Sequence, residues 1–91
     1  MPILRLVRTH ATQEMYEAAV EAMQLHTRHP LGLIMHGATC VDGEMQIAQV
    51  WESEDYAKRF EEETLNPTLD ALVPDHLNEV TIFQLHDLVT P

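Results

Sequence analysis

The chain is poor in cysteine, in basic side chains and in long hydrophobic runs. Cys40 is the only cysteine among the 91 residues, which excludes an internal disulfide and a cage of metal-binding thiolates. Lys and Arg number 5 against 15 Asp and Glu, and the formal net charge is −10. Nucleic acids and anionic membrane surfaces both attract basic side chains, so we expect the chain to bind neither.

No stretch of the sequence is apolar for long enough to cross a bilayer, and the N-terminus lacks the three regions of a signal peptide. The hydrophobic fraction of 45% and the charged fraction of 22% are typical of a globular protein. A chain of this length supports one hydrophobic core. We therefore expect a single domain over residues 1–91, soluble and located in the cytoplasm.

The first half of the chain shows a strand pattern followed by a helical one. Residues 3–9 are rich in branched apolar side chains, which suits a strand. Thr12 is a favourable N-cap for a helix in which Tyr16, Val20 and Met23 recur at helical spacing. His29-Pro30 is expected to end this helix, because proline restricts the residue before it.

A second helix over residues 54–65 is expected after Ser53, its N-cap, and before Asn66-Pro67, its break. A further turn over 68–73 and the pair Pro74-Asp75 would lead into a last strand over 79–88. The predicted order is β-α-β-β-α-β, the α+β ferredoxin-like unit. Right-handed crossovers place both helices on one face of its antiparallel sheet.

Asp42-Gly43 separates two strand-like stretches, residues 33–41 and 44–52, and predicts a two-residue type I′ turn between them. Such a turn fixes which residues of the two strands lie opposite each other. The predicted pairs are Val41 with Glu44, Met35 with Val50, and Ile34 with Trp51.

Both faces of this hairpin are substantially apolar, although two helices cover only one face of the sheet. The uncovered face measures roughly 400 Å², a size that marks an interface or a binding groove. A second copy of the chain, packed sheet against sheet, is the simplest cover. We assign the face of His36, Gln49 and Trp51 to this dimer side, because Gly37 and Ala48 on the other face would let helices approach closely.

On the outer strands the same assignment is extended by alternation. We expect Leu4 and Leu6 to face the helices, and the mixed set of Ile3, Arg5 and Val7 to face away from them. On the last strand we expect Gln84 and His86 to face a pocket, opposite Phe83 and Leu85.

Five motifs in order along the chain carry a resemblance to a known family. They are Pro30-Leu31-Gly32-Leu33-Ile34-Met35-His36, Asp42-Gly43, Val50-Trp51-Glu52-Ser53, Phe60-Glu61-Glu62 and Leu65-Asn66-Pro67. With them the chain resembles the dimeric α+β barrel superfamily, and within it the antibiotic biosynthesis monooxygenase-like domains. The resemblance implies a homodimer whose two sheets form a barrel, with a ligand pocket in each protomer.

The same resemblance implies oxygenation of polycyclic aromatic phenols by molecular oxygen, with no cofactor and no metal. Other branches of the superfamily degrade haem or cyclise polyketides. Haem degradation is disfavoured here, because residues 54–65 contain no histidine to bind the iron. Fold transfers between such relatives better than chemistry does.

Two residues are candidates for catalysis. His36 could take a proton from a phenol and so favour the electron-rich anion that reacts with oxygen, or it could only form a hydrogen bond in a half-buried interface. Trp51 could stack on a flat ligand and orient an oxygen with its indole N–H, or it could serve packing alone.

Six further residues are candidates for contact with the substrate. Arg5 could pair with an anionic substrate, although an interface salt bridge with an acidic residue of the partner copy is favoured in so acidic a chain. Gln49 is expected beside His36 and Trp51, where it could position oxygen or substrate. The remaining candidates are Ile34, Tyr56, Phe60 and His86.

The resulting hypothesis is a cofactor-independent oxygenase of aromatic or polyketide-like phenols, with its pocket between the sheet and the helices of a homodimer. Two alternatives stay open at this point. One is a non-oxidative polyketide cyclase or isomerase of the same shape, and the other is a small-ligand-binding dimer without catalysis.

Overall fold

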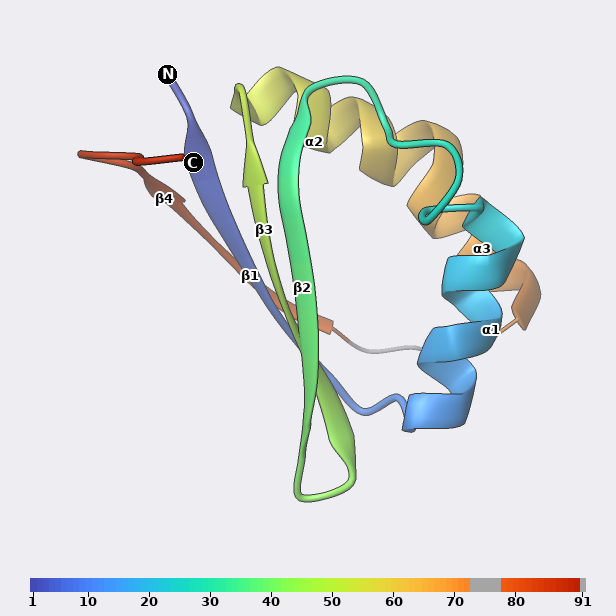
Figure 1. The fold of residues 1–91 in the computed structure, drawn as a ribbon. Helices are drawn as coiled ribbons and strands as arrows, with labels where there is room; N and C mark the ends of the chain where they lie inside the picture. Colours follow the sequence, from blue (N-terminus) through green and yellow to red (C-terminus); the bar gives the residue numbers. More distant parts are fainter. Residues whose placement is uncertain (73–77, 91) are drawn as a thin grey trace.

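A four-stranded antiparallel sheet carries the described helices on one of its faces (Figure 1). This computed structural model describes residues 1–72 and 78–90. The elements in chain order are β1 (Ile3–Thr9), α1 (Gln13–Met23), β2 (Leu33–Val41), β3 (Glu44–Trp51), α2 (Glu54–Phe60), a π-helical turn (Glu61–Leu65), α3 (Asn66–Leu72) and β4 (Asn78–Gln84). The strands lie in the order β2-β3-β1-β4, so the predicted ferredoxin-like α+β fold is confirmed.

The hairpin of β2 and β3 turns at Asp42 and Gly43, whose φ angles of 52° and 83° fit the predicted type I′ turn. The predicted pairs Val41 with Glu44 and Met35 with Val50 are confirmed. The third pair is wrong, because a register shift between Leu33 and Met35 places Leu33, not Ile34, opposite Trp51. Ile34 is the additional residue at this β-bulge and is left 38% exposed.

Helix α1 begins as predicted, since the Thr12 hydroxyl accepts a hydrogen bond from the Met15 N–H at 3.2 Å. It ends earlier than predicted. Gln24 adopts the left-handed conformation (φ 55°), and its N–H bonds back to the carbonyls of Glu21 and Val20. This arrangement closes the helix well before Pro30.

The second helical region does not break at Asn66-Pro67 as predicted but continues through α3. The Asn66 N–H bonds to the Glu61 carbonyl five residues back, which makes the turn wider than an α-turn. Pro67, the second residue of α3, follows this wider turn directly and has no N–H to bond back into it. Val73 and Pro74-Asp75 lie outside the described residues. Strand β4 ends at Gln84, four residues before the predicted end.

The helices cover the face of His36, Gln49 and Trp51, so the assignment of this face to the dimer is wrong. Trp51 is fully buried in a cluster with Ile3 and Val20 of the same interior, and its ring contacts that of Phe60 in α2. Bulky side chains are needed to fill the space between sheet and helices, and this face supplies them.

The expected orientation of Leu4 and Leu6 is wrong for the same reason. Leu6 is 37% exposed, whereas Ile3 and Val7 on the helix-facing side are buried. Because paired residues share a face, the register shows which side chains lie on the face without helices, here called the open face. They include Leu4, Leu6, Met35, Gly37, Ala48, Val50, Thr81 and Phe83.

Candidate functional site

A cavity of about 370 Å³ lies between the helix-facing side of the sheet and the helical layer. This volume is within the range of small-molecule sites, about 300–1,000 Å³. Most of its walls are apolar, and they come from both layers: Val7, Met15, Ala19, Val20, Met23, Leu25, Met45, Ile47, Phe60, Leu65 and Leu69. The cavity therefore suits a ligand with a largely apolar body.

One wall of the cavity is polar and begins at a buried charge. The Arg5 side chain is only 3% exposed. Its Nε and Nη2 atoms donate to Glu61 Oε1 at 2.8 and 2.5 Å, and Nη1 donates to Gln49 Oε1 at 3.1 Å. Glu61 opens the π-helical turn, from which it reaches across to β1. The guanidinium charge is thus compensated by Glu61 of the same chain. The salt bridge expected for Arg5 from the sequence was instead one with an acidic residue of a second copy.

Gln49 is held in one orientation by two donors. Its Oε1 accepts both from Arg5 and from Trp51 Nε1, which lies at 3.1 Å. A guanidinium and an indole N–H can only donate, so this end of the amide must be the oxygen. The amide nitrogen therefore points at His36 Nδ1, 3.0 Å away.

The orientation of Gln49 determines where neutral His36 carries its proton. Nδ1 faces an NH₂ group and must accept, so the proton is on Nε2. Nε2 lies 2.6 Å from Tyr16 Oη and donates to it. The two rings are nearly parallel, at 8°. Since Tyr16 Oη accepts from His36, its own O–H remains available for another acceptor.

The charge states of His36 and Tyr16 agree with this direction of the hydrogen bonds. Burial lowers the pKa of His36, and the nearby His26 lowers it further, so the imidazole is neutral at neutral pH. Burial raises the pKa of Tyr16, so its phenol keeps its proton.

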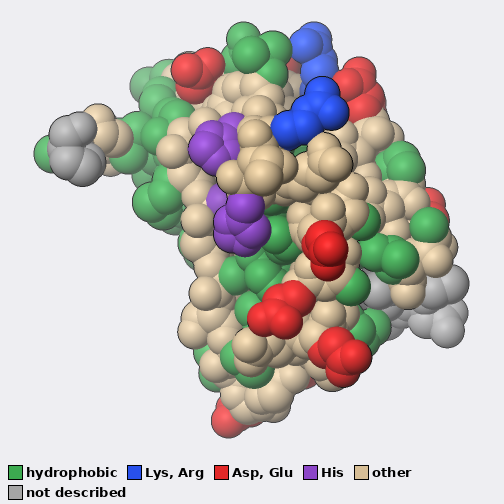
Figure 2. Space-filling view, turned by 45° about the vertical axis from the view of Figure 1, so that its right-hand side comes forward, with side chains coloured by type: hydrophobic (Ala, Val, Ile, Leu, Met, Phe, Trp, Pro, Cys, Tyr) green, Lys and Arg blue, Asp and Glu red, His purple; other side chains and the backbone are tan. Residues whose placement is uncertain are grey.

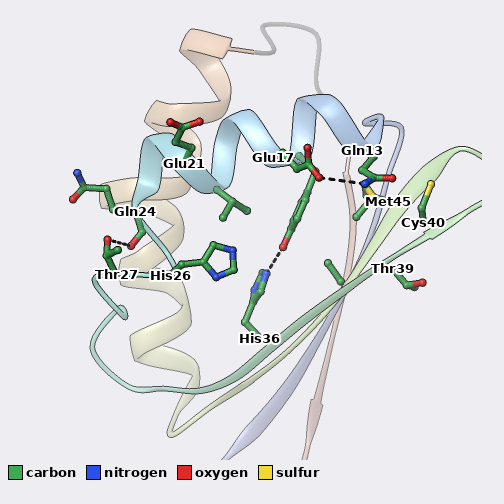
Figure 3. A pocket seen from close by; sticks show the side chains of 13 residues that line it. Gln13, Glu17, Glu21, Gln24, His26, Thr27, His36, Thr39, Cys40 and Met45 are labelled. Atoms are coloured by element: carbon green, nitrogen blue, oxygen red, sulfur yellow. Dashed lines mark hydrogen bonds between the residues drawn. The ribbon is translucent and has the colours of Figure 1, made fainter.

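A second hollow, of about 830 Å³, runs along the outside between α1 and the edge strand β2. His26 and His36 both project into this outer groove, while Gln13, Glu17 and Glu21 lie along its helical rim (Figure 3). Tyr16 and His36 line the outer groove and also the inner cavity. The hydrogen-bonded pair therefore stands between the two spaces.

Four of the eight predicted site residues line the inner cavity: Arg5, His36, Gln49 and Phe60. Trp51 lies behind Gln49, with its ring centroid 5.3 Å from that of Phe60. Tyr56 packs against the core cluster, Ile34 is exposed at the bulge, and His86 is exposed beyond the end of β4. These last four are not among the described residues that line the cavity. The roles predicted for all eight stay predictions.

Tyr16 is a site residue that the sequence did not reveal. Its spacing with Val20 and Met23 predicts an apolar stripe of a helix, and no pattern marks its hydroxyl as part of a polar wall. Only the approach of α1 to β2 brings Oη to His36, twenty positions further along the chain.

Among the described residues, no three His, Cys, Asp or Glu side chains group in a way that could hold a metal ion. Acidic side chains are spread over the surface in Figure 2, and histidines gather at another part of it. Within residues 1–72 and 78–90, no helix has the length and apolar character needed to cross a membrane.

Comparison with known proteins gives matches in structure alone, because no family model and no curated protein matches the chain. A variant of SnoaB, a cofactor-independent oxygenase from Streptomyces nogalater, superposes with a TM-score of 0.70 at 16% identity, over 99% of this chain and 98% of that one. A proposed antibiotic biosynthesis monooxygenase from Deinococcus radiodurans gives a TM-score of 0.69 at 16% identity, over 100% and 98%.

A dimeric ferredoxin-like protein of unknown function from Thermobifida fusca gives a TM-score of 0.67 at 13% identity, over 93% of this chain and 92% of that one. At these identities the likeness is one of fold, and it spans nearly the whole chain. The chain therefore has the ferredoxin-like α+β fold of the antibiotic biosynthesis monooxygenase-like proteins, as its sequence motifs predicted.

Proposed function

We propose that the protein is a small oxygenase that oxidises a flat phenolic molecule with molecular oxygen in the inner cavity. The observation that carries this proposal is an apolar cavity with a single polar wall, on the fold of proteins that include a cofactor-independent oxygenase. The apolar walls would hold the body of an aromatic ligand, and the polar wall would orient its oxygen atoms.

The charges of the wall favour a neutral ligand over an anionic one. The Arg5 guanidinium is already bound by Glu61 and Gln49, so it has little capacity left for a substrate carboxylate. His36 and Tyr16 are uncharged at neutral pH. An anion would enter without a counter-charge, at a considerable cost in desolvation.

An anthrone-type phenol fits these requirements, and its oxidation balances without a further reactant. The central CH₂ group loses two hydrogens, one atom of O₂ becomes a new carbonyl oxygen, and the other leaves with the two hydrogens as water. The substrate supplies all the electrons, so the proposal requires neither a reductant nor a cofactor.

Two roles are open for His36 within this proposal. It acts as the base that takes a proton from the substrate, or it orients Tyr16. The Trp51 N–H, expected to orient an oxygen of the ligand, donates instead to Gln49. We therefore propose that Trp51 holds Gln49 in place and does not contact the substrate oxygen directly.

The test is incubation of the purified protein with an anthrone-type phenol, in air and under nitrogen, while oxygen uptake and quinone formation are recorded. We expect quinone formation above the spontaneous rate in air alone. Turnover under nitrogen would instead identify a cyclase or isomerase. Binding without turnover in either atmosphere would identify a ligand-binding module and overturn the oxygenase proposal.

We also propose that the protein acts as a homodimer joined through the open face. Leu6, Met35 and Phe83 are 37%, 51% and 50% exposed on that face, and the described helices all lie on the opposite one (Figure 1). An apolar surface of this kind marks an interface. A second copy of the same face would cover it with closed two-fold symmetry.

A further inference from the structure

We infer that the Tyr16 hydroxyl donates a hydrogen bond to the ligand, and that the ligand presents a ketone or enolate oxygen to it. This inference rests on the proposed function and names the substrate group that the site recognises. Tyr16 lines both the inner cavity and the outer groove, and its hydroxyl bonds to His36, which lines both spaces as well.

The inference follows from the direction of the hydrogen bonds along the polar wall. Arg5 and Trp51 can only donate, so Gln49 receives them with its oxygen and donates with its nitrogen to His36. His36 then donates from Nε2 to Tyr16. Every bond along this relay points the same way, so the relay ends at Tyr16, whose hydroxyl proton is not used within it.

Reversal of the relay would be costly. For Tyr16 to donate to His36, the imidazole proton must move to Nδ1, where it meets the NH₂ group of Gln49. If Gln49 turned over to accept that proton, its NH₂ group would face the donors of Arg5 and Trp51, and both would lose their acceptor. Buried donors without acceptors are strongly disfavoured.

This direction of the hydrogen bonds favours one of the two roles open for His36. His36 orients Tyr16 and does not act as the base for the substrate proton. Its one basic nitrogen, Nδ1, is occupied by Gln49, so no lone pair is left for a substrate proton. His36 is therefore a positioning residue that fixes the proton of Tyr16. The Tyr16 hydroxyl in turn is the group that touches the substrate oxygen.

The chemistry at that oxygen follows directly. In an anthrone the ketone oxygen accepts the Tyr16 hydrogen bond, and one proton of the CH₂ group on the opposite side of the central ring, conjugated with the ketone through the flanking rings, passes to water. The electrons of the broken C–H bond form the enolate, whose negative charge develops on the oxygen that Tyr16 already contacts. A fixed donor at a developing oxyanion stabilises it more than it stabilises the ketone. Tyr16 keeps its proton throughout, and O₂ then attacks the enolate carbon.

The first experiment measures the tautomer of His36 without any ligand. Nitrogen-15 NMR of the histidine side chains distinguishes a proton on Nε2 from one on Nδ1, and the signals of His36 are those missing from His36→Gln. We expect Nε2–H in the wild-type protein at neutral pH. A proton on Nδ1 would overturn the inference, whatever the activity of the enzyme.

The second experiment uses two flat probes that differ only in oxygen. Anthraquinone carries carbonyl oxygens and anthracene carries none. Tyr16→Phe should weaken anthraquinone binding about 3- to 10-fold, the value of one hydrogen bond, and leave anthracene binding unchanged. His36→Gln should weaken anthraquinone binding in the same sense, and the double variant should lose no more than Tyr16→Phe alone.

The outcomes separate this inference from the proposed function. Equal effects on both probes, or no effect of Tyr16→Phe on anthraquinone, would overturn the role of Tyr16 while the cavity remains a site for aromatic ligands. Binding of neither probe to the wild-type protein would overturn the proposed function and the inference together.

Discussion

Arg5 is the residue from which the polar wall is organised. Its charge is buried at 3% exposure, and a single carboxylate compensates it. Burial of a charge is tolerated when the charge is paired and hydrogen-bonded, and here each of the three guanidinium nitrogens donates to Glu61 or Gln49. The pair also fixes Gln49, so the same contacts bear on stability and on the geometry of the site.

Glu61→Ala would remove the partner and leave the guanidinium uncompensated. Loss of one member of a fully buried pair costs about 3–5 kcal/mol. Because the Glu61 side chain is 29% exposed, water can partly replace it, and we expect a loss of about 2–3 kcal/mol. Urea denaturation measures this change. Glu62→Ala is the matched control on the exposed side of the same turn, and an equal loss there would contradict the explanation.

His36 should make stability depend on pH. Its pKa in the folded protein lies below the ordinary value of about 6.5, so the unfolded chain binds its proton first as the pH falls. The free energy of unfolding should therefore decrease below about pH 6.5, until the pH reaches the folded pKa.

The comparison of wild type with His36→Gln isolates this contribution, because the other histidines are common to both proteins. Urea denaturation between pH 7.5 and 5 should show a steeper decline for the wild type. Parallel curves would show that burial does not affect the titration of His36.

At the scale of elements, β2 lies between two glycines, Gly32 and Gly43. At each of them a side chain would be unfavourable, for a different reason. Gly43 has φ 83° in the hairpin turn, and a Cβ there would meet no atom within 4 Å. Gly32 has φ 86° before the strand, and a Cβ there would collide with the Tyr56 ring. Gly43 is therefore favoured by its backbone conformation alone. Gly32 is favoured both by its backbone conformation and by its packing against Tyr56.

Gly43→Ala should cost about 1–2 kcal/mol, because only the left-handed conformation is penalised. Gly43→Asn should cost less, since asparagine tolerates that conformation. Gly32→Ala should cost more than Gly43→Ala, because Tyr56 must also move. Thermal unfolding at one fixed protein concentration ranks the three variants. A Gly32→Ala protein as stable as Gly43→Ala would show that Tyr56 does not pack there.

At the scale of the whole molecule, the sheet has one face packed on helices and one apolar face without them. Leu6 lies on the open face in β1, an inner strand of the sheet. A charge at this position would be buried without a partner in a dimer and would be solvated in a monomer.

Leu6→Glu should therefore convert a dimer into a folded monomer and halve the mass measured by analytical ultracentrifugation. Leu72→Glu is the control, because Leu72 is 46% exposed on α3 in the helical layer and should leave the mass unchanged. A wild-type protein that is monomeric at micromolar concentration would contradict the proposed dimer.

The local patterns of the sequence determined the order of the elements, the start of α1 at Thr12 and the turn at Asp42-Gly43. Each of these depends on residues close together in the chain, whose capping and φ preferences act without the rest of the fold. Alternation along the strands also placed Arg5, His36, Gln49 and Trp51 on one face together.

Tertiary structure decided which face the helices cover, where β2 bulges, and that Tyr16 completes the polar wall. These outcomes depend on how side chains distant in sequence fill a shared volume. Both faces of the hairpin are apolar, so hydrophobicity alone cannot choose between them. In the folded protein the large Trp51 side chain fills the space under the helices and Arg5 pairs with Glu61 of the helical layer, and both contacts exist only in the tertiary structure.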